Sequence, residues 1–294
     1  MSNTNTKEIA FEKSIEEVLL NTGYQSIPSQ SFDKEKAIFP EQIIAFIKDT
    51  QLKEWQKLES ILKENTANQI IYDLTKWIEL HGVLATLRHG FKCYGKQLQI
   101  AYFKPSHSMN DEVLEKYEKN RLGITRQLYY STRNTNSIDV VLSLNGLPLV
   151  TLELKNQLSH QNILHAKKQY KEDRDPRELI FEFKKRTLVH FAVDTDLVEM
   201  TTRLAKDATY FLPFNKGNNG GAGNPVDLEG LSYKTAYLWK EVLQRDSLLE
   251  ILAKFIHLQV DERITEEGRK VKKETLIFPR YHQLKAVLKM LHTA

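Results

Sequence analysis

The strongest constraint on the fold is a pair of apolar, strand-like runs on either side of one Asn-Gly dipeptide. Residues 137–144 read SIDVVLSL and residues 147–156 read LPLVTLELKN, with Asn145-Gly146 between them. Asn-Gly readily adopts the positive φ angles of a tight turn, so two such runs around it are the strongest short-range signal of a β-hairpin. The sequence therefore predicts an antiparallel hairpin of two largely buried strands.

Three charged residues, Asp139, Glu153 and Lys155, interrupt these apolar runs. Charged side chains are almost never fully buried without a partner. Side chains alternate between the two faces of a strand, so Glu153 and Lys155 share one face with Thr151. If Asp139 faces the same way, two carboxylates and one amine converge. Two carboxylates on adjacent strands suit Mg²⁺, and a nearby lysine can position or activate water for phosphodiester hydrolysis.

The register of the hairpin decides whether the two acids meet. A strict two-residue turn puts Asp139 opposite Leu152, and the two carboxylates then lie on opposite faces. Asp139 comes opposite Glu153 only if the loop has an odd number of residues or if one strand carries a bulge. Pro148 cannot donate to a ladder and favours an irregular turn. We therefore predict a three- or five-residue loop, or a bulge.

The competing interpretation is a cross-strand salt bridge of Asp139 or Glu153 with Lys155 on a solvated sheet face. The D…ExK pattern is short, and most chance matches to it are of this kind. Here the acids lie inside apolar strands on a hairpin, and a basic helix follows them. On the residues alone, the two interpretations stand about equal.

Composition bounds the class of protein but not its function. Of 294 residues, 41% are hydrophobic and 27% are charged, and 42 Lys+Arg against 38 Asp+Glu leave a net charge of +4. No run of about 18 apolar residues is present, so no membrane span is expected. The single Cys93 excludes an internal disulfide and a cysteine-built zinc site, and it suits a reducing compartment. We expect a soluble cytoplasmic α/β protein whose mild positive charge permits binding to a polyanion.

Hydrophobic periodicity divides the rest of the chain into elements. Helices are predicted at 6–22, 41–64, 67–88, 111–120, 159–174 and 235–258, and further strands at 98–103, 124–131, 187–196 and 198–204. The charge run 261–274 is interpreted as a linker or an exposed ribbon. The Gly-rich segment 214–225 lacks the Lys-Ser/Thr of a P-loop and is interpreted as a loop.

The amino-acid sequence around the hairpin resembles that of a known family. Asp139 with Glu153-Leu154-Lys155 resembles the PD-(D/E)xK nuclease pattern. The segments that extend the resemblance are NRLGITRQLYYS, HAKKQYKEDRDPRE, KRTLVHFAVDTDLVEMTTRL and YLWKEVLQRDSLLEILAKFIH. From about residue 85 onward, the chain resembles the N-terminal part of the R (restriction) subunit of type I restriction–modification enzymes.

The resemblance implies an α/β restriction-endonuclease-like core, with a mixed β-sheet flanked by helices and an N-terminal helical region. It divides the chain into an endonuclease domain at 1–260, with a catalytic core at about 118–205, a linker at 261–274 and a truncated start of a superfamily 2 helicase-like motor at 275–294. FPRYHQ resembles the entry to that motor, where Gln283 lies near the adenine of ATP. The Walker A lysine is not in this chain, so ATP hydrolysis is expected of the full-length subunit only.

The resemblance also implies roles for individual residues. Asp139 and Glu153 match the acids that hold Mg²⁺, and Lys155 matches the catalytic lysine. Tyr170 matches the tyrosine of a Gln-x-x-x-Tyr motif, whose glutamine position is Ala166 here. Either Gln169, beside the tyrosine, or Gln161, in the first turn of the helix, is a candidate for the missing glutamine. Some related nucleases add a glutamate from the first helix, for which the candidates are Glu8 and Glu12.

Basic residues near the site are candidates for contacts with DNA phosphates. They are Lys167, Lys168, Lys171 and Arg174 on the helix after the lysine, together with Arg126. A solvated helix face fits equally well, because acidic residues are interleaved with these bases. His165 and His190 are interpreted as packing or surface residues in preference to metal ligands.

The implied activity is Mg²⁺-dependent cleavage of double-stranded DNA, after ATP-driven translocation by the full-length subunit in a complex with modification and specificity subunits. Two rival hypotheses stay open. One is a PD-(D/E)xK nuclease of recombination or repair. The other is a catalytically degenerate nuclease fold that serves as a DNA-binding or subunit-docking module.

Overall fold

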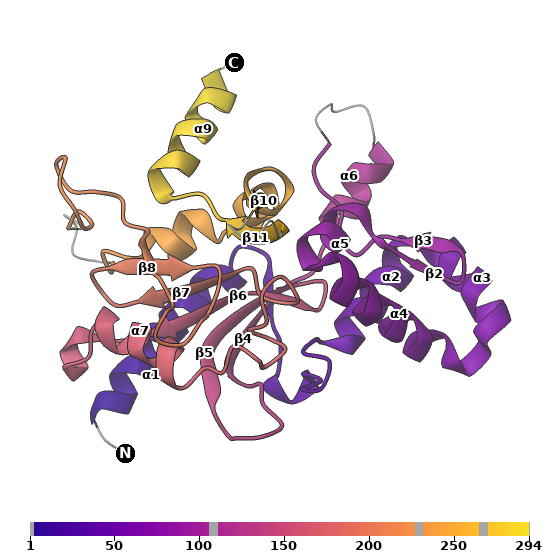
Figure 1. Cartoon of the computed structure of the whole chain (residues 1–294), viewed down its shortest axis with the longest axis horizontal. Helices are drawn as coiled ribbons and strands as arrows, with labels where there is room; N and C mark the ends of the chain where they lie inside the picture. Colours follow the sequence, from indigo (N-terminus) through magenta and orange to yellow (C-terminus); the bar gives the residue numbers. More distant parts are fainter. Residues whose placement is uncertain (1–2, 106–110, 227–231, 265–269, 294) are drawn as a thin grey trace.

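A mixed seven-stranded sheet forms the centre of the computed structural model, which describes residues 3–105, 111–226, 232–264 and 270–293 (Figure 1). The strand order is β1-β4-β5-β6-β7-β8-β9. The β1–β4 and β6–β7 pairs are parallel, and the other neighbouring pairs are antiparallel. The predicted α/β class, a mixed sheet flanked by helices, is confirmed.

The elements have the following bounds. The strands of the central sheet are β1 Tyr24–Ser26, β4 Leu122–Tyr129, β5 Ser137–Leu144, β6 Leu147–Leu154, β7 Val189–Val193, β8 Val198–Thr201 and β9 Leu212–Pro213. Two hairpins lie outside it, namely β2 Phe91–Cys93 with β3 Lys96–Leu98, and β10 His257–Ile264 with β11 Lys270–Ile277. The helices are α1 Asn3–Leu20, α2 Pro40–Thr50, α3 Leu52–Leu62, α4 Thr66–His81, α5 Val83–His89, α6 Asp111–Glu118, α7 Ile163–Glu172, α8 Arg245–Glu250 and α9 Tyr281–Thr293.

Different helices cover the two faces of the sheet. Val140 of β5 lies in the same apolar core as Phe11 of α1 and the helical segment 238–255. Its neighbour Val141 points the other way and shares a second core with Tyr170 of α7. In Figure 1, α7 accordingly lies in front of the sheet, and α1 passes behind it. Apolar side chains of β5 therefore pack on both faces of the sheet.

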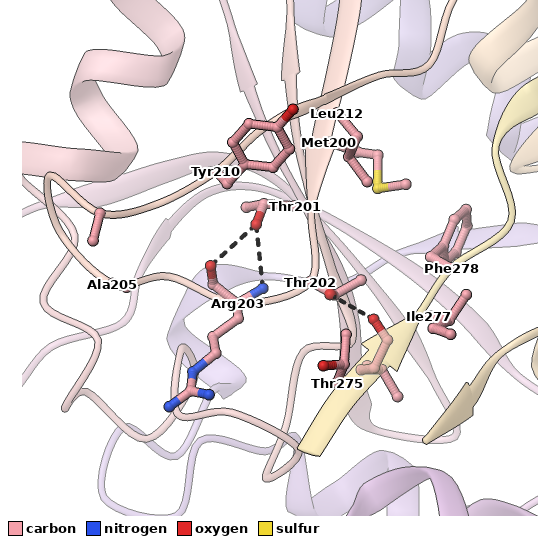
Figure 2. A pocket seen from close by; sticks show the side chains of 12 residues that line it. Met200, Thr201, Thr202, Arg203, Ala205, Tyr210, Leu212, Thr275, Ile277 and Phe278 are labelled. Atoms are coloured by element: carbon pink, nitrogen blue, oxygen red, sulfur yellow. Dashed lines mark hydrogen bonds between the residues drawn. The ribbon is translucent and has the colours of Figure 1, made fainter. Parts of the chain in front are cut away.

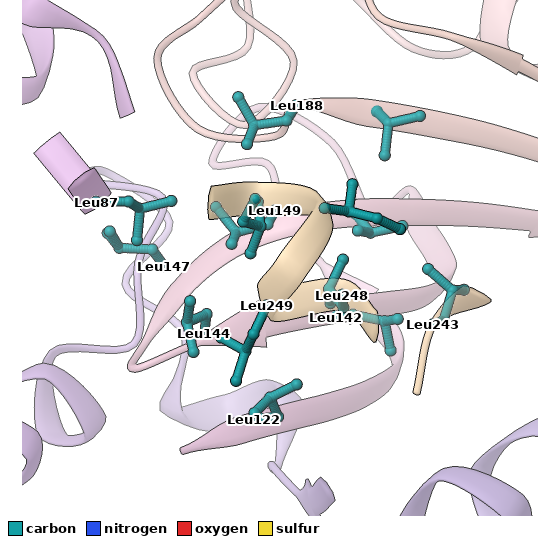
Figure 3. Packing of buried hydrophobic residues seen from close by; sticks show 14 of the residues in the cluster. Leu87, Leu122, Leu142, Leu144, Leu147, Leu149, Leu188, Leu243, Leu248 and Leu249 are labelled. Atoms are coloured by element: carbon teal, nitrogen blue, oxygen red, sulfur yellow. The ribbon is translucent and has the colours of Figure 1, made fainter. Parts of the chain in front are cut away.

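Leucines dominate the core on the α1 side of the sheet (Figure 3). Leu142 of β5 is fully buried there, and Leu248 and Leu249 of α8 are almost fully buried. Burying one such side chain stabilises the fold by about 2 kcal/mol. A slip of one residue in β5 would move its leucines to the other face, so this core fixes the register of the strand that carries Asp139.

The predicted strand at 98–103 is wrong beyond Leu98, where β3 ends. The side chain of Gln51 takes the place of a strand partner, because its Nε2 donates to the carbonyl of Gln99 at 2.9 Å and its Oε1 accepts from the N–H of Gln99 at 2.7 Å. The same residue separates α2 from α3, so the helix predicted at 41–64 is divided in two. One long-range amide contact accounts for both differences.

The predicted hairpin is present, and its turn has two residues. Asn145 and Gly146 take φ angles of 50° and 88°, and Leu144 pairs with Leu147 across the turn. Asn145 is also tied down by its side chain, whose Oδ1 accepts from the N–H of Arg121 at 2.6 Å. The Asn-Gly signal was therefore sufficient to locate this turn.

The predicted bulge is confirmed. The register of β5 against β6 shifts by one residue, and Leu149 is the extra residue on β6. Beyond the shift, Val140 pairs with Leu152. Continued by one step, this register would bring Asp139 opposite Glu153, which is the arrangement that puts both carboxylates on one face of the sheet.

The segment after the last core helix is a docked ribbon. Residues 261–274 were expected to be a linker or an exposed ribbon, and the structure agrees with the ribbon. Strand β10 pairs antiparallel with β11, and residues 265–269 lie outside the described part. The ring of Phe278 lies 5.8 Å from that of Phe191 in β7, and Tyr281 packs against Tyr237 at 5.0 Å. Among the described helices, none combines the length and apolar character that crossing a membrane requires.

Replacing Gly146 with alanine tests the turn. A Cβ at Gly146, where φ is +88°, would lie 2.5 Å from the carbonyl oxygen of Phe39, whereas a Cβ at Gly95, where φ is +71°, meets nothing within 4 Å. Both substitutions force an alanine into the left-handed region, at about 1 kcal/mol. We expect Gly146→Ala to lower the free energy of unfolding, measured in urea, by clearly more than the matched control Gly95→Ala. Equal losses would show that the contact with Phe39 does not constrain the turn.

Candidate active site

The three charged residues of the hairpin gather at one end of β5 and β6. Glu153 is fully buried, Lys155 is 8% exposed, and Asp139 is partly buried. The negative charge of Asp139 raises the pKa of Glu153, and the positive charge of Lys155 lowers it. Each of these charges therefore lies within electrostatic reach of the central carboxyl group, as the register of the bulged hairpin requires.

Glu153 has one paired and one unpaired carboxylate oxygen. Its Oε1 accepts from Nε of Arg174 at 2.7 Å, while its buried Oε2 has no hydrogen-bond donor among the described residues. Burial raises the pKa of Glu153 to about 8, against the opposing charge of Arg174. A buried acceptor without a donor is costly and calls for an explanation. A cation ligated by Oε2 supplies one.

The donor set suits a hard divalent cation that keeps several waters. Asp139 and Glu153 offer two carboxylates, which is what Mg²⁺ takes from proteins when phosphate and water complete its coordination. Within the described residues, no group of three or more His, Cys, Asp or Glu side chains is arranged to hold a metal ion. The candidate donor set is thus two acids, and it does not resemble an all-protein cage.

Asp139 is oriented by two donors. Its Oδ2 accepts from the backbone N–H of Leu154 at 2.7 Å, and its Oδ1 accepts from Nε2 of Gln127 at 3.3 Å. Gln127 has a φ of 47°, which is unusual for a non-glycine residue inside a strand and marks local strain. Its amide also donates to Glu12 at 2.7 Å, so this distorted residue connects the hairpin with α1.

Two glutamates of the first helix reach the site. The pKa of Glu12 is raised to about 7, first by burial and then by the charge of Asp139. Burial also raises the pKa of Glu8, which feels the charges of both Lys155 and Asp139, and its Oε1 is buried without a donor in the described part of the chain. Both are the residues that the family resemblance offers as the additional glutamate of the first helix. Their i, i+4 spacing puts them on one face of α1.

Tyr170 lies beneath the site on α7. Its hydroxyl is 2.8 Å from Oγ1 of Thr151, two residues before Glu153 on the same face of β6, and it donates to the carbonyl of Phe191 at 3.3 Å. Gln169 occupies the next position on the helix and is partly buried, and no described residue hydrogen-bonds its side chain. The structure thus brings Tyr170 to the strand of the acids, and the role of Gln169 stays a prediction.

Arg174 is not available for DNA, contrary to the expectation from sequence. It is 2% exposed, and its guanidinium is bonded to Glu153 and to the carbonyl of Ser137 at 2.7 Å. The periodicity of α7 suggested a surface position, but the helix ends at Glu172. The turn that follows directs the side chain of Arg174 inward.

The remaining basic candidates differ in how strongly they are paired. Arg126 is held by Glu12 at 3.1 Å and by Glu16 at 3.0 Å. Lys167 pairs with Glu199, and Lys171 donates to a backbone carbonyl. The side chain of Lys168 is 66% exposed and has only a long contact, 3.7 Å, with Glu172. Lys168 is thus the candidate with the most accessible charge.

Comparison with known families gives a single decisive result. The family described as "Type I restriction enzyme R protein N terminus" matches residues 5–209, which is more than half of the chain. The chain belongs to this family. No curated protein matches it.

Family membership agrees with the geometry of the site. The range matched in this R-protein domain includes Glu8 and Glu12 on α1, the hairpin acids and Arg174. It thus extends over the first helix, where the sequence resemblance had been weak. Membership points to a restriction endonuclease domain, and the cluster around Glu153 is its candidate active site.

A cavity of about 320 Å³ in this R-protein domain lies elsewhere. It is formed by β8, the loop after it and β11, and Figure 2 shows Thr201, Arg203, Tyr210 and Phe278 in its wall. None of the three charged residues of the hairpin lines it. Cavity shape alone would therefore point away from the acids, and the buried unpaired oxygen of Glu153 is the better guide.

The two histidines of interest are packing and capping residues in this domain. His165 hydrogen-bonds Asn162 at 3.0 Å at the start of α7. His190 is buried on β7, where its Nδ1 lies 2.8 Å from Oγ1 of Thr151. Burial lowers the pKa of His190 from 6.5 to about 3, so its ring stays neutral at physiological pH.

The neutral His190 should make the fold sensitive to acid. Its pKa is lower in the folded state, so below pH 6.5 the unfolded chain takes up a proton that the folded chain does not. We expect about 2 kcal/mol of stability to be lost between pH 7.5 and pH 5 from this group. Urea unfolding of His190→Asn should show a loss on acidification that is smaller by this amount, while exposed His160→Asn should behave like the wild type. An unchanged loss in His190→Asn would contradict the assignment.

Proposed function

We propose that this domain hydrolyses phosphodiester bonds of double-stranded DNA in a Mg²⁺-dependent reaction at the Asp139–Glu153–Lys155 cluster. The observation that carries the proposal is the bulge at Leu149. The register that it sets, continued by one step, opposes Asp139 to Glu153, and Glu153 has a buried oxygen with no donor in the described structure. Membership of the R-protein N-terminal family supports the same assignment.

Each residue of the cluster has a distinct task in the proposed reaction. Asp139 and Glu153 hold Mg²⁺, which when bound stabilises negative charge on the phosphate and lowers the pKa of water. Lys155 positions the attacking water and offsets the charge that develops on the phosphate oxygens. Lys155 follows the last residue of β6 directly, so the strand that carries Glu153 also fixes the start of the lysine side chain.

Tyr170 and Gln169 support the cluster from α7. Tyr170 orients β6 through its contact with Thr151, and so acts on Glu153 from below. Gln169 is the candidate for contact with the lysine or with a phosphate, since its side chain is partly exposed on the same helix. The shift of the glutamine from position 166 is compatible with the structure, because Ala166 is buried in the core under the sheet.

We assign the reaction to the full-length subunit, in which ATP-driven translocation delivers DNA, together with modification and specificity subunits. Gln283, proposed to lie near the adenine of ATP, is in the first turn of α9, where its Oε1 accepts from the N–H of Arg280 at 2.9 Å. Phe278 and Tyr281 attach this segment to the sheet that holds the acids. Such an attachment is what the coupling of the two activities requires.

Substitution of the cluster in the full-length subunit, assembled with its partner subunits, tests the proposal. We expect Lys155→Ala to reduce double-strand cleavage by about 10²–10⁴-fold and leave translocation intact. Asp139→Asn and Glu153→Gln should abolish cleavage at any Mg²⁺ concentration. The matched control is Glu172→Gln, an exposed acid of α7 whose ion pair in the described part of the chain is with Lys168.

The same measurements separate the rival functions. Normal cleavage by Lys155→Ala would reject this active site. Absence of cleavage in the wild type, with DNA binding retained, would favour a degenerate binding or docking module. Cleavage that is independent of ATP and of the partner subunits would favour a nuclease of recombination or repair.

The accessible charge of Lys168 gives a prediction for DNA binding. A lysine that contacts a phosphate releases one counterion, so Lys168→Ala should weaken binding for all sequences alike and reduce the slope of log K against log salt by about 1. Binding is measured by fluorescence anisotropy at several salt concentrations. Exposed Lys57 on α3, in the helical lobe beside the sheet, is the control. Equal slopes for Lys168→Ala and the wild type would remove Lys168 from the DNA interface.

A further inference from the structure

We propose that Arg174 is the positioning residue of the cation site: it holds one oxygen of Glu153 so that the other is presented to the metal. This inference rests on the proposed function, because it concerns how the same two acids bind Mg²⁺. Arg174 does not contact DNA in this role, and it acts only through Glu153.

The guanidinium of Arg174 joins the two strands that carry the acids. Its Nε donates to Oε1 of Glu153 on β6 at 2.7 Å, and its Nη2 donates to the carbonyl of Ser137 on β5 at 2.7 Å. Ser137 lies two residues before Asp139. Because the guanidinium is planar and rigid, the two bonds fix the end of β6 against the end of β5 where both acids lie.

Arg174 is itself held in place. The ring of Tyr130, at the end of β4, lies 5.7 Å from the guanidinium carbon. The turn that carries Arg174 is tied back to the sheet by Asn136, whose Nδ2 donates to the carbonyl of Asp173 at 3.3 Å. With 2% of its surface exposed, the side chain has no room to swing away to solvent. The orientation it imposes on Glu153 is therefore built into the fold.

This arrangement determines how Glu153 can bind a cation. Oε1 is occupied by the guanidinium, and Oε2 is buried with no donor among the described residues. Oε2 is thus the oxygen of Glu153 that has no competing donor in the described structure. A single fixed oxygen beside Asp139 leaves coordination positions for water and phosphate, which a bidentate carboxylate would restrict.

The opposite role for Arg174 makes the opposite prediction. A guanidinium beside a cation site could instead compete with the cation for Glu153, and its removal would then tighten metal binding. The positioning role predicts weaker binding, because the carboxylate of Glu153 loses its fixed orientation. The direction of the change in metal affinity therefore decides between the two.

The experiment titrates Mn²⁺, as a probe for Mg²⁺, into the 294-residue chain by calorimetry, in wild type and in Arg174→Met, Arg174→Lys and Arg177→Met. We expect Arg174→Met to weaken Mn²⁺ binding at least 10-fold, with partial rescue by Arg174→Lys, which keeps the charge but loses the planar pair of donors. Arg177 is the matched control, since its side chain is 77% exposed and its ion pair among the described residues is with Asp175. Unchanged or tighter binding in Arg174→Met overturns the inference.

Circular dichroism melts without metal separate loss of folding from loss of positioning. If Arg174→Met does not fold, Arg174→Lys carries the test, and it should bind Mn²⁺ several-fold more weakly than wild type. Wild-type affinity in a folded Arg174→Lys then overturns the inference.

Two further variants distinguish failure of this inference from failure of the proposed site. If wild type and Glu153→Gln bind Mn²⁺ equally, the proposed metal site and the role of Arg174 are both rejected. If Glu153→Gln loses binding while Arg174→Met keeps it, only the role of Arg174 is rejected. Addition of Arg174→Met to Glu153→Gln should cause no further loss, because Arg174 acts through Glu153 alone. An additional loss would show a separate role and contradict the inference.

Discussion

A shift of one residue in the pairing of β5 with β6 determines whether the two acids of the candidate site can meet. Side chains in a strand alternate with a period of two, and the extra residue at Leu149 shifts the register so that, one step beyond the Val140–Leu152 pair, Glu153 and not Leu152 comes opposite Asp139. The Asn-Gly turn alone would have separated the two acids. The leucine core behind β5 and β6 prevents the strands from slipping back, and an apolar face that contacts no substrate thereby maintains the chemistry of the other face.

Several charged side chains are buried together at the site. Hydrogen bonds from neighbouring residues offset the free-energy cost of burying them. Glu153 is stabilised by Arg174, Asp139 by a backbone N–H and by Gln127, and Glu12 by Arg126 and the same Gln127. Breaking one partner of such a buried pair costs about 3–5 kcal/mol, so these contacts are expected to be retained. Among the carboxylates of this group, a buried oxygen without a donor in the described structure belongs to Glu153 and to Glu8.

A structural feature could be predicted from the sequence when the residues that cause it lie close together in the chain. The hairpin, the bulge and the shared face of the acids follow from residues within one strand length, such as Pro148 beside the Asn-Gly turn. The burial of Arg174 could not be predicted, because it depends on a turn that returns the chain to Glu153, 21 residues earlier. The false strand after Leu98 has a similar cause, since Gln51 satisfies a backbone 48 residues away.

The first helix shows why the catalytic unit is larger than the segment around the motif. A core of about 118–205 contains both strand acids and Lys155, yet it omits α1. Gln127, which orients Asp139, has its shorter hydrogen bond to Glu12 on that helix, and Arg126 beside it is neutralised by Glu12 and Glu16. Without α1, Gln127 would keep a strained φ angle with only Ser137 and Asp139 as partners, and the apolar face of β5 would lose Phe11. The amino-terminal helix is therefore part of the structure that orients the acids, although it contributes no residue to the D…ExK pattern.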